Sequence, residues 1–129
     1  MTECDVLVID DEPVVRDAVR RVLEAKGLRV ATAPDAASGL GHAALADCRL
    51  VLCDLMLPDG SGIDVLAEIK RRRPAVPVVL ITGYATVEHA EHAREAGAAG
   101  FLAKPFEARE LLDSVRQALG DQLVLAGKS

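Results

Sequence analysis

Five short apolar runs, separated by segments with helical periodicity, constrain the fold of this chain most strongly. The runs cover residues 6–9, 28–33, 50–53, 76–81 and 99–103. The first, third and fourth runs are apolar at nearly every position, without polar alternation. Such runs are typical of strands that helices cover on both faces of a parallel sheet. The sequence therefore predicts a buried parallel sheet of five strands.

Helix signals fill the intervals between the runs. The expected helices cover residues 13–26, 35–46, 62–72, 86–96 and 107–119. Pro13 suits the first turn of a helix and Gly27 ends it, while the last helix carries an apolar stripe at positions 111, 112, 115 and 119. Strands and helices that alternate five times predict an α/β fold with three layers, a doubly wound sheet and right-handed crossovers.

The length of 129 residues fits one domain. We expect this domain to span residues 1–120, with residues 121–129 as a tail or a truncated linker. Apolar residues make up 50% of the chain, yet no apolar stretch approaches the roughly 20 residues that cross a bilayer. The first residues also lack the basic start of a signal peptide. These features predict a cytoplasmic protein without a membrane segment.

Charge and rare residues exclude several classes of function. The net charge is −5, and the basic cluster Arg71-Arg72-Arg73 is too short to form a nucleic-acid patch, which argues against direct contact with nucleic acid. The aromatic residues are only Tyr84, Phe101 and Phe106, too few to build a surface for base stacking. The three cysteines show no C-x-x-C spacing, so neither a disulfide framework nor a zinc site is indicated.

Polar residues follow four of the expected strands. They are Asp10-Asp11, Asp54, Thr82-Gly83 and Lys104-Pro105. In a doubly wound sheet the carboxyl ends of the strands form the ligand-binding edge, so these residues are expected to meet. Carboxylates gathered within about 5 Å repel one another by roughly 3 kcal/mol per pair at an effective dielectric near 20, so a cation is needed. Lys104 supplies one charge, and an oxygen-only ligand set favours Mg²⁺ over zinc.

An aspartate, a hydroxyl and a lysine around Mg²⁺ could hold a phosphoryl group on a carboxylate, because metal and ammonium both stabilise phosphoryl oxygens.

Taken singly, each of the polar residues has a simpler interpretation. An Asp10-Asp11 pair serves about as often as a helix N-cap, and a lone lysine before proline is usually solvated. His89 and His92 lie three residues apart on one helix, where a solvated face is the favoured reading over a metal site.

Three other functions fit the same architecture. A flavodoxin-type electron carrier would bind a phosphate after the first strand, where Asp10, Asp11 and Glu12 would repel it. A phosphatase with an aspartate nucleophile usually has a second aspartate two residues later, and Met56 stands there. An interaction module that is never phosphorylated remains open.

Four motifs resemble the receiver domains of two-component response regulators. They are Val8-Ile9-Asp10-Asp11-Glu12-Pro13, Asp54-Leu-Met-Leu-Pro58-Asp-Gly60-Ser-Gly62, Ile81-Thr82-Gly83-Tyr84-Ala85 and Phe101-Leu-Ala-Lys104-Pro105-Phe106. They occur in the family's order and spacing, and the resemblance covers about residues 5–119. It implies a flavodoxin-like (βα)5 fold with strand order 2-1-3-4-5.

The resemblance also implies a role for each site residue. Asp54 would accept a phosphoryl group, with Asp11 and Asp54 binding Mg²⁺ directly, Asp10 largely through water, and the backbone carbonyl of Met56 completing the protein ligands. Thr82 and Lys104 would contact phosphoryl oxygens, and the Lys104-Pro105 peptide would be cis. The chain would not be an enzyme in the ordinary sense, because it would assist only its own phosphotransfer and autodephosphorylation.

Signal output follows from the same resemblance. Thr82 and Phe101 match the family's switch residues, which alter the surface of the fourth helix, fifth strand and fifth helix. Met56 and Tyr84 would flank the entrance and tune the loss of the phosphoryl group. The implied partners are a sensor histidine kinase or a phosphotransfer protein, an effector domain missing from this chain, and a second copy that pairs through the switch surface.

Overall fold

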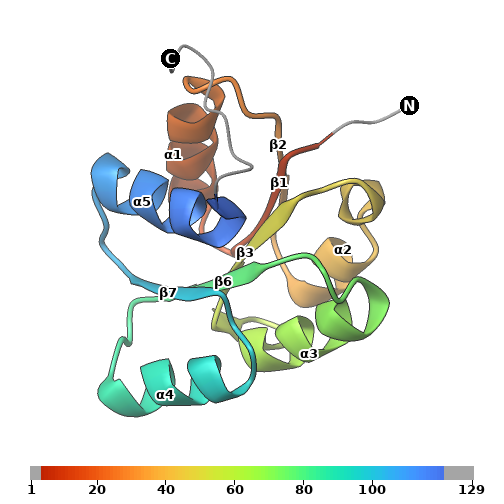
Figure 1. Ribbon diagram of the computed structural model, residues 1–129, viewed down its shortest axis with the longest axis vertical. Helices are drawn as coiled ribbons and strands as arrows, with labels where there is room; N and C mark the ends of the chain where they lie inside the picture. Colours follow the sequence, from red (N-terminus) through yellow and green to blue (C-terminus); the bar gives the residue numbers. More distant parts are fainter. Residues whose placement is uncertain (1–3, 121–129) are drawn as a thin grey trace.

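A computed structural model describes residues 4–120 of the chain. Five parallel strands form one sheet in the order β2-β1-β3-β6-β7 (Figure 1). The strands are β1 (Val6–Ile9), β2 (Val30–Ala33), β3 (Leu50–Asp54), β6 (Val78–Thr82) and β7 (Gly100–Ala103). Numbered within this sheet alone, the order is 2-1-3-4-5, which confirms the expected topology. β1, β3 and β6 are buried at every position, as their continuous apolar runs predict.

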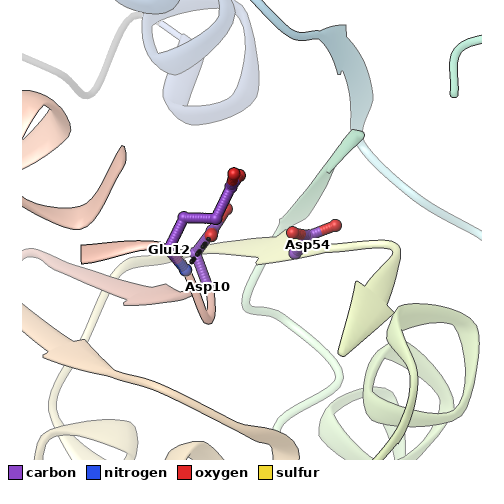
Figure 2. A group of neighbouring side chains, drawn as sticks. All are labelled: Asp10, Glu12 and Asp54. Atoms are coloured by element: carbon purple, nitrogen blue, oxygen red, sulfur yellow. Dashed lines mark hydrogen bonds between the residues drawn. The ribbon is translucent and has the colours of Figure 1, made fainter. Parts of the chain in front are cut away.

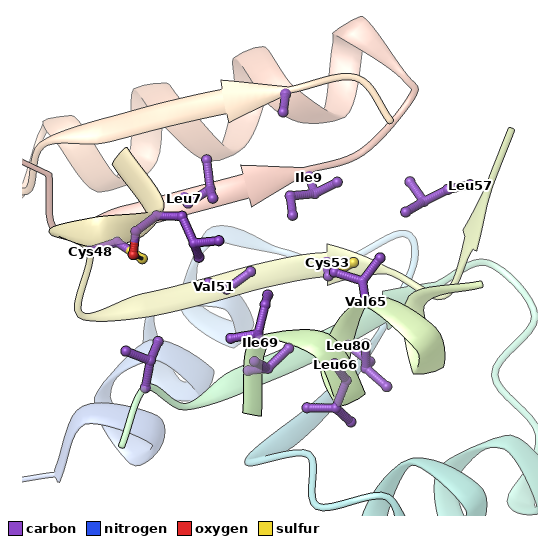
Figure 3. Close-up of a cluster of buried hydrophobic side chains, with 14 of the residues drawn as sticks. Leu7, Ile9, Cys48, Val51, Cys53, Leu57, Val65, Leu66, Ile69 and Leu80 are labelled. Atoms are coloured by element: carbon purple, nitrogen blue, oxygen red, sulfur yellow. Dashed lines mark hydrogen bonds between the residues drawn. The ribbon is translucent and has the colours of Figure 1, made fainter. Parts of the chain in front are cut away.

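Helices cover both faces of the sheet (Figure 1). One face carries α1 (Pro13–Glu24) and α5 (Ala108–Leu119), which pack Leu23 and Leu111 onto the sheet. The other face carries α2 (Ala36–Leu40), α3 (Gly62–Arg72) and α4 (Val87–Glu95). Figure 3 shows this second core, where Ile69 of α3 lies beside β3. The three expected layers are therefore confirmed.

The second helix differs from the sequence prediction. The expected helix over residues 35–46 is divided into α2 and a 3-10 turn, η1 (Ala43–Ala46). Gly41 ends α2, and the Nδ1 of His42 then accepts a hydrogen bond from the backbone N–H of Ala44 at 2.9 Å, which begins η1. Two glycines within three residues weaken a continuous helix. His42 is half-buried in this capping position.

A small hairpin after β3 was not predicted. It consists of β4 (Met56–Leu57) and β5 (Gly60–Ser61), which pair antiparallel. Strands of two residues carry too little pattern to be recognised in a sequence. Asp59 in its turn accepts hydrogen bonds from the backbone N–H groups of Ala36 and Ala37, at 2.8 and 3.0 Å. The hairpin is thereby attached to the first turn of α2.

All three cysteines are buried and free. Burial raises the pKa of the Cys48 thiol to about 11 and raises the pKa of Cys53 further. Such thiols pack as small apolar residues. Within residues 4–120, no helix is both long and apolar enough to cross a membrane. The expected tail or linker at residues 121–129 lies outside the described residues.

Candidate functional site

The carboxyl ends of four strands bring the predicted polar residues to one edge of the sheet. Asp10 follows β1, Asp54 ends β3, Thr82 ends β6 and Lys104 follows β7. A pocket of about 810 Å³ opens at this edge, and Asp54, Thr82 and Lys104 line it together with residues of α1 and of the loop after β6. Parallel strands that end at one edge account for the convergence of residues so distant in sequence.

The Lys104 ammonium is the electrostatic centre of this site. Its Nζ lies 3.0 Å from Asp10 Oδ2, 2.6 Å from Glu12 Oε1 and 2.9 Å from Asp54 Oδ2. Burial of the ammonium lowers its pKa, but the hydrogen bonds to Glu12 and Asp54 and the ionic contact with Asp10 outweigh burial and raise the pKa of Lys104 above its usual value. Lys104 is therefore a cation throughout the physiological pH range.

Asp10 is the most buried acid of the site, with no exposed side-chain surface. Its Oδ1 accepts a hydrogen bond from the backbone N–H of Glu12 at 2.8 Å, drawn in Figure 2. Its Oδ2 has the ionic contact with Lys104 but no partner with hydrogen-bond geometry among the described residues. Burial raises the pKa of Asp10, and the neighbouring Asp54 adds to the rise. A buried carboxylate oxygen without a hydrogen bond is costly unless another group, such as a metal ion, contacts it.

Asp54 is held from both sides of its carboxylate. Oδ1 accepts a hydrogen bond from the backbone N–H of Met56 at 3.0 Å, and Oδ2 accepts one from Lys104. Behind Asp54 the chain passes very close to Gly62, where an added Cβ would lie 2.4 Å from the Asp54 carbonyl oxygen. Only glycine, which has no side chain, allows this close approach, so the backbone conformation that positions Asp54 requires Gly62.

Asp10, Glu12 and Asp54 are the three acids that meet. Each offers an oxygen within 4.8 Å of the others, and Figure 2 shows Asp10 and Glu12 together after β1, with Asp54 near them on β3. Asp11, which the sequence analysis paired with Asp54, is exposed and lines the pocket outside this group.

Two contacts of the site were not predicted from the sequence. Glu12 was missed as a contact of Lys104, although its place in a run of three acids after β1 is a usable signal. Arg16 was also missed; it donates a hydrogen bond to the Asp10 carbonyl at 2.7 Å and steadies the loop.

The remaining predicted residues fall into two places. Met56, Thr82 and Tyr84 line the pocket beside Asp54; Thr82 is fully buried, whereas Met56 and Tyr84 are exposed. Phe101 is half-buried in a second pocket, between β7 and α4. The Lys104-Pro105 peptide is cis, as the resemblance implied. Within residues 4–120 no histidine joins a group of metal-ligating side chains.

A site built from buried oxygen ligands, one hydroxyl and one ammonium is suited to hold a divalent cation and a phosphoryl group. The chemistry available is the transfer of a phosphoryl group to a carboxylate. Neither thiol nor imidazole ligands are present in the acidic group, which disfavours zinc.

Comparisons with known proteins agree with this geometry. Residues 6–116 match the family described as the response regulator receiver domain. The C4-dicarboxylate transport transcriptional regulatory protein DctD of Pseudomonas aeruginosa is 40% identical over 121 residues, which cover 91% of this chain and 25% of DctD. The nitrogen assimilation regulatory protein NtrX of Azorhizobium caulinodans is 38% identical, over 89% of this chain and 26% of NtrX. The chain thus spans about a quarter of the length of these two relatives.

Solved structures show the same similarity. The receiver domain of NtrX from Brucella abortus superimposes with a TM-score of 0.83 at 39% identity, covering 89% of this chain and 98% of that one. The chemotaxis protein CheY4 of Vibrio cholerae gives a TM-score of 0.84 at 26% identity, covering 92% of this chain and 100% of that one.

Proposed function

The chain belongs to the response regulator receiver domain family, and we propose that Asp54 is the residue that accepts the phosphoryl group in its signalling reaction. The observation that carries this proposal is the placement of Asp54. Asp54 and Glu12 both touch Lys104 and line the open pocket with Thr82, but Asp54 ends a buried strand and its carboxylate is also held by the Met56 N–H, whereas Glu12 is exposed on the loop after β1. Asp10 is sealed inside the protein, and Asp11 lies outside the group that surrounds the ammonium.

In the reaction, a carboxylate oxygen of Asp54 attacks the phosphorus of a phosphohistidine. The new P–O bond forms as the P–N bond breaks, and the leaving imidazole of the donor takes its proton from solvent. Lys104 pairs with one phosphoryl oxygen, and the Thr82 hydroxyl donates to another. The Met56 N–H, already bonded to Asp54 Oδ1, holds the carboxylate in one orientation.

The residues present fit a magnesium ion. The buried Asp10 Oδ2 accepts no hydrogen bond within residues 4–120, where its one polar contact described above is the ionic one with Lys104, and all the acids of the group offer oxygen. Asp10, Asp11, Asp54 and the carbonyl of Met56 would hold the ion, with Glu12 at the exposed side. Bound Mg²⁺ would neutralise the charge on the phosphoryl oxygens.

Thr82 and Phe101 serve as the switch. Thr82 lies at the end of β6 and Phe101 within β7, so a movement of the hydroxyl toward the phosphoryl group opens space beside the aromatic ring. The surface of α4, β7 and α5 then changes its shape. Met56 and Tyr84 are 55% and 65% exposed at the pocket and control how readily water reaches the phosphoryl group. Autodephosphorylation by that water resets the switch.

The partners follow from the same chemistry. A sensor histidine kinase or a phosphotransfer protein supplies the phosphoryl group, and because kinases draw it from ATP, the reaction takes place in the cytoplasm. DctD and NtrX are about four times as long as this chain, so residues 1–120 act as a receiver whose effector is a further domain or a separate partner. Pairing of two copies through α4, β7 and α5 is one output of the switch.

Intact-protein mass measurement tests the proposal. The chain is incubated with acetyl phosphate and Mg²⁺, beside Asp54→Asn, a chelator control and Asp64→Asn, which alters an exposed aspartate of α3. The expected result is a labile gain of one phosphoryl group in the wild type and in Asp64→Asn, and none in Asp54→Asn or with chelator. A gain that persists in Asp54→Asn would place the acceptor elsewhere. No gain despite demonstrated Mg²⁺ binding would favour an interaction module that works without phosphorylation.

A further inference from the structure

The loop between β6 and α4 is held by a polar connection that the proposed function leaves unexplained. The Thr82 Oγ1 accepts a hydrogen bond from the backbone N–H of Tyr84 at 3.0 Å. The carbonyl of the same Tyr84 lies 2.5 Å from Nδ1 of His89, in the first turn of α4. Since a carbonyl oxygen can only accept, Nδ1 must carry the hydrogen. One residue, Tyr84, therefore links the Thr82 hydroxyl to the His89 imidazole.

His89 is also fixed to its own helix. Its backbone N–H donates to the side chain of Thr86 at 3.1 Å, which is the N-cap bond of α4. The imidazole is thus part of a capped helix end and moves with α4. A displacement of Tyr84 that follows Thr82 would pull on this end of the helix through the Tyr84 carbonyl.

Apolar packing anchors α4 only weakly. Ala93 is its one buried residue, whereas α3 buries Val65, Leu66 and Ile69 against the sheet. A methyl group contributes little apolar area. Gly83, next to Thr82, has open space around the position of a Cβ, so the segment between β6 and Tyr84 is not packed tightly either. Polar links at the start of α4 therefore carry a large share of its attachment to the site.

We propose that His89 is a positioning residue that couples Thr82 to α4 through the Tyr84 carbonyl. The proposal rests on the proposed function, because the movement that His89 transmits begins when Asp54 is phosphorylated. Both the neutral Nδ1–H tautomer and the imidazolium donate to a carbonyl, so the link requires no change of protonation. His89 touches neither the phosphoryl group nor the acids around Lys104.

Four variants separate coupling from simple stability. His89→Ala removes the donor, while His89→Asn keeps an N–H donor near the position of Nδ1. His92→Ala removes an exposed histidine three residues further along α4. Thr86→Ala removes the helix cap and leaves the His89 side chain in place. Two quantities are compared: hydrogen exchange of the backbone amides of residues 83–90 in the unphosphorylated protein, and the change of α4 amide chemical shifts when Asp54 is phosphorylated.

In His89→Ala the amides of the loop are expected to exchange roughly two- to tenfold faster, as for the loss of one partly exposed hydrogen bond. Asp54 should accept the phosphoryl group to the wild-type extent, yet the α4 shift changes should fall to less than half. His89→Asn and His92→Ala should resemble the wild type, and Thr86→Ala should raise exchange in α4 while keeping the phosphorylation response.

Wild-type shift changes in phosphorylated His89→Ala, or no rescue by His89→Asn, would overturn the coupling while leaving the proposed function intact. A wild-type chain that accepts no phosphoryl group would overturn the proposed function, and this proposal with it.

Discussion

Replacement of Lys104 by methionine removes the cation that three carboxylates share, and should destabilise the metal-free protein. The side chain of Lys104 is 13% exposed, that of Asp10 is fully buried and that of Asp54 is 6% exposed. One charge pair at about 4 Å contributes roughly 4 kcal/mol at an effective dielectric of 20, before desolvation is counted. Removal of one partner of a buried ion pair costs about 3–5 kcal/mol, because the other charge stays buried without compensation.

The lower end of that range applies to Lys104→Met. Glu12 is 57% exposed, so the loss of its ion pair with Lys104 lowers the unfolding free energy only a little. Asp10 has a raised pKa already and can take up a proton, which limits the loss. We therefore expect the free energy of unfolding to fall by about 3 kcal/mol at pH 8, equivalent to roughly 10 °C in melting temperature for a domain of this size. At pH 5, where Asp10 protonates more readily, the loss should be smaller.

Chemical denaturation with chelator present measures this loss, with Lys26→Met as a control at an exposed lysine. Adding Asp10→Asn to Lys104→Met should recover more than half of the lost stability, because the uncompensated buried charge is then absent. The electrostatic argument fails if Lys104→Met matches the wild type at pH 8, or if the loss is undiminished when Asp10 is asparagine.

Three further perturbations test other parts of the site. The raised pKa of Lys104 means that its stabilisation is complete below its ordinary value of 10.5 and is lost as pH rises through the higher folded value. Metal-free wild type should thus lose unfolding free energy above pH 10.5 more steeply than Lys104→Met, and parallel curves in denaturant titrations would contradict this assignment. Asp54→Asn relieves repulsion within the acidic group, but the asparagine oxygen can accept only one of the two hydrogen bonds that the carboxylate accepts. Because these two effects oppose each other, the unfolding free energy of the variant in chelator should stay within about 1 kcal/mol of the wild type. Calorimetry showing a much larger loss would refute the idea that relieved repulsion offsets the lost hydrogen bond. Gly62→Ala places a methyl group against the Asp54 carbonyl, so it should lower the unfolding free energy by about 1–3 kcal/mol and slow the phosphorylation of Asp54. An unchanged melting temperature and an unchanged phosphorylation rate would show that the backbone relaxes freely.

The sheet and its edge could be predicted because their signals are long or repeated. Three uninterrupted apolar runs determine β1, β3 and β6, and the polar residue after each run identifies the edge where Asp10, Asp54 and Thr82 meet. The division of the second helix depends on a side-chain cap from His42, which no periodicity reveals. The β4–β5 hairpin is too short to have a pattern of its own.

Within the site, the sequence predicts which residues converge but not which of them touch. Asp11 and Glu12 are adjacent acids, and the direction of the loop after β1 decides that Glu12, and not Asp11, reaches Lys104. That direction depends on Pro13 beginning α1 and on Arg16 holding the Asp10 carbonyl. The His89 contact with Tyr84 likewise depends on where α4 begins, which a sequence pattern locates only to within a few residues.

The order of strands in the sheet divides the site into a fixed and an adjustable part. β1, β3 and β6 each have a hydrogen-bonded neighbour on both sides; Asp54 and Thr82 end two of these strands, and Asp10 directly follows the third. β7 is bonded to β6 alone among the described strands, and Lys104 follows directly after it. A shift of β7 disturbs one ladder, whereas a shift of β1 or β3 disturbs two. The backbone of the buried acids is therefore the fixed part of the site. When the site binds groups of different size and charge, it is the backbone of Lys104 that shifts to accommodate them.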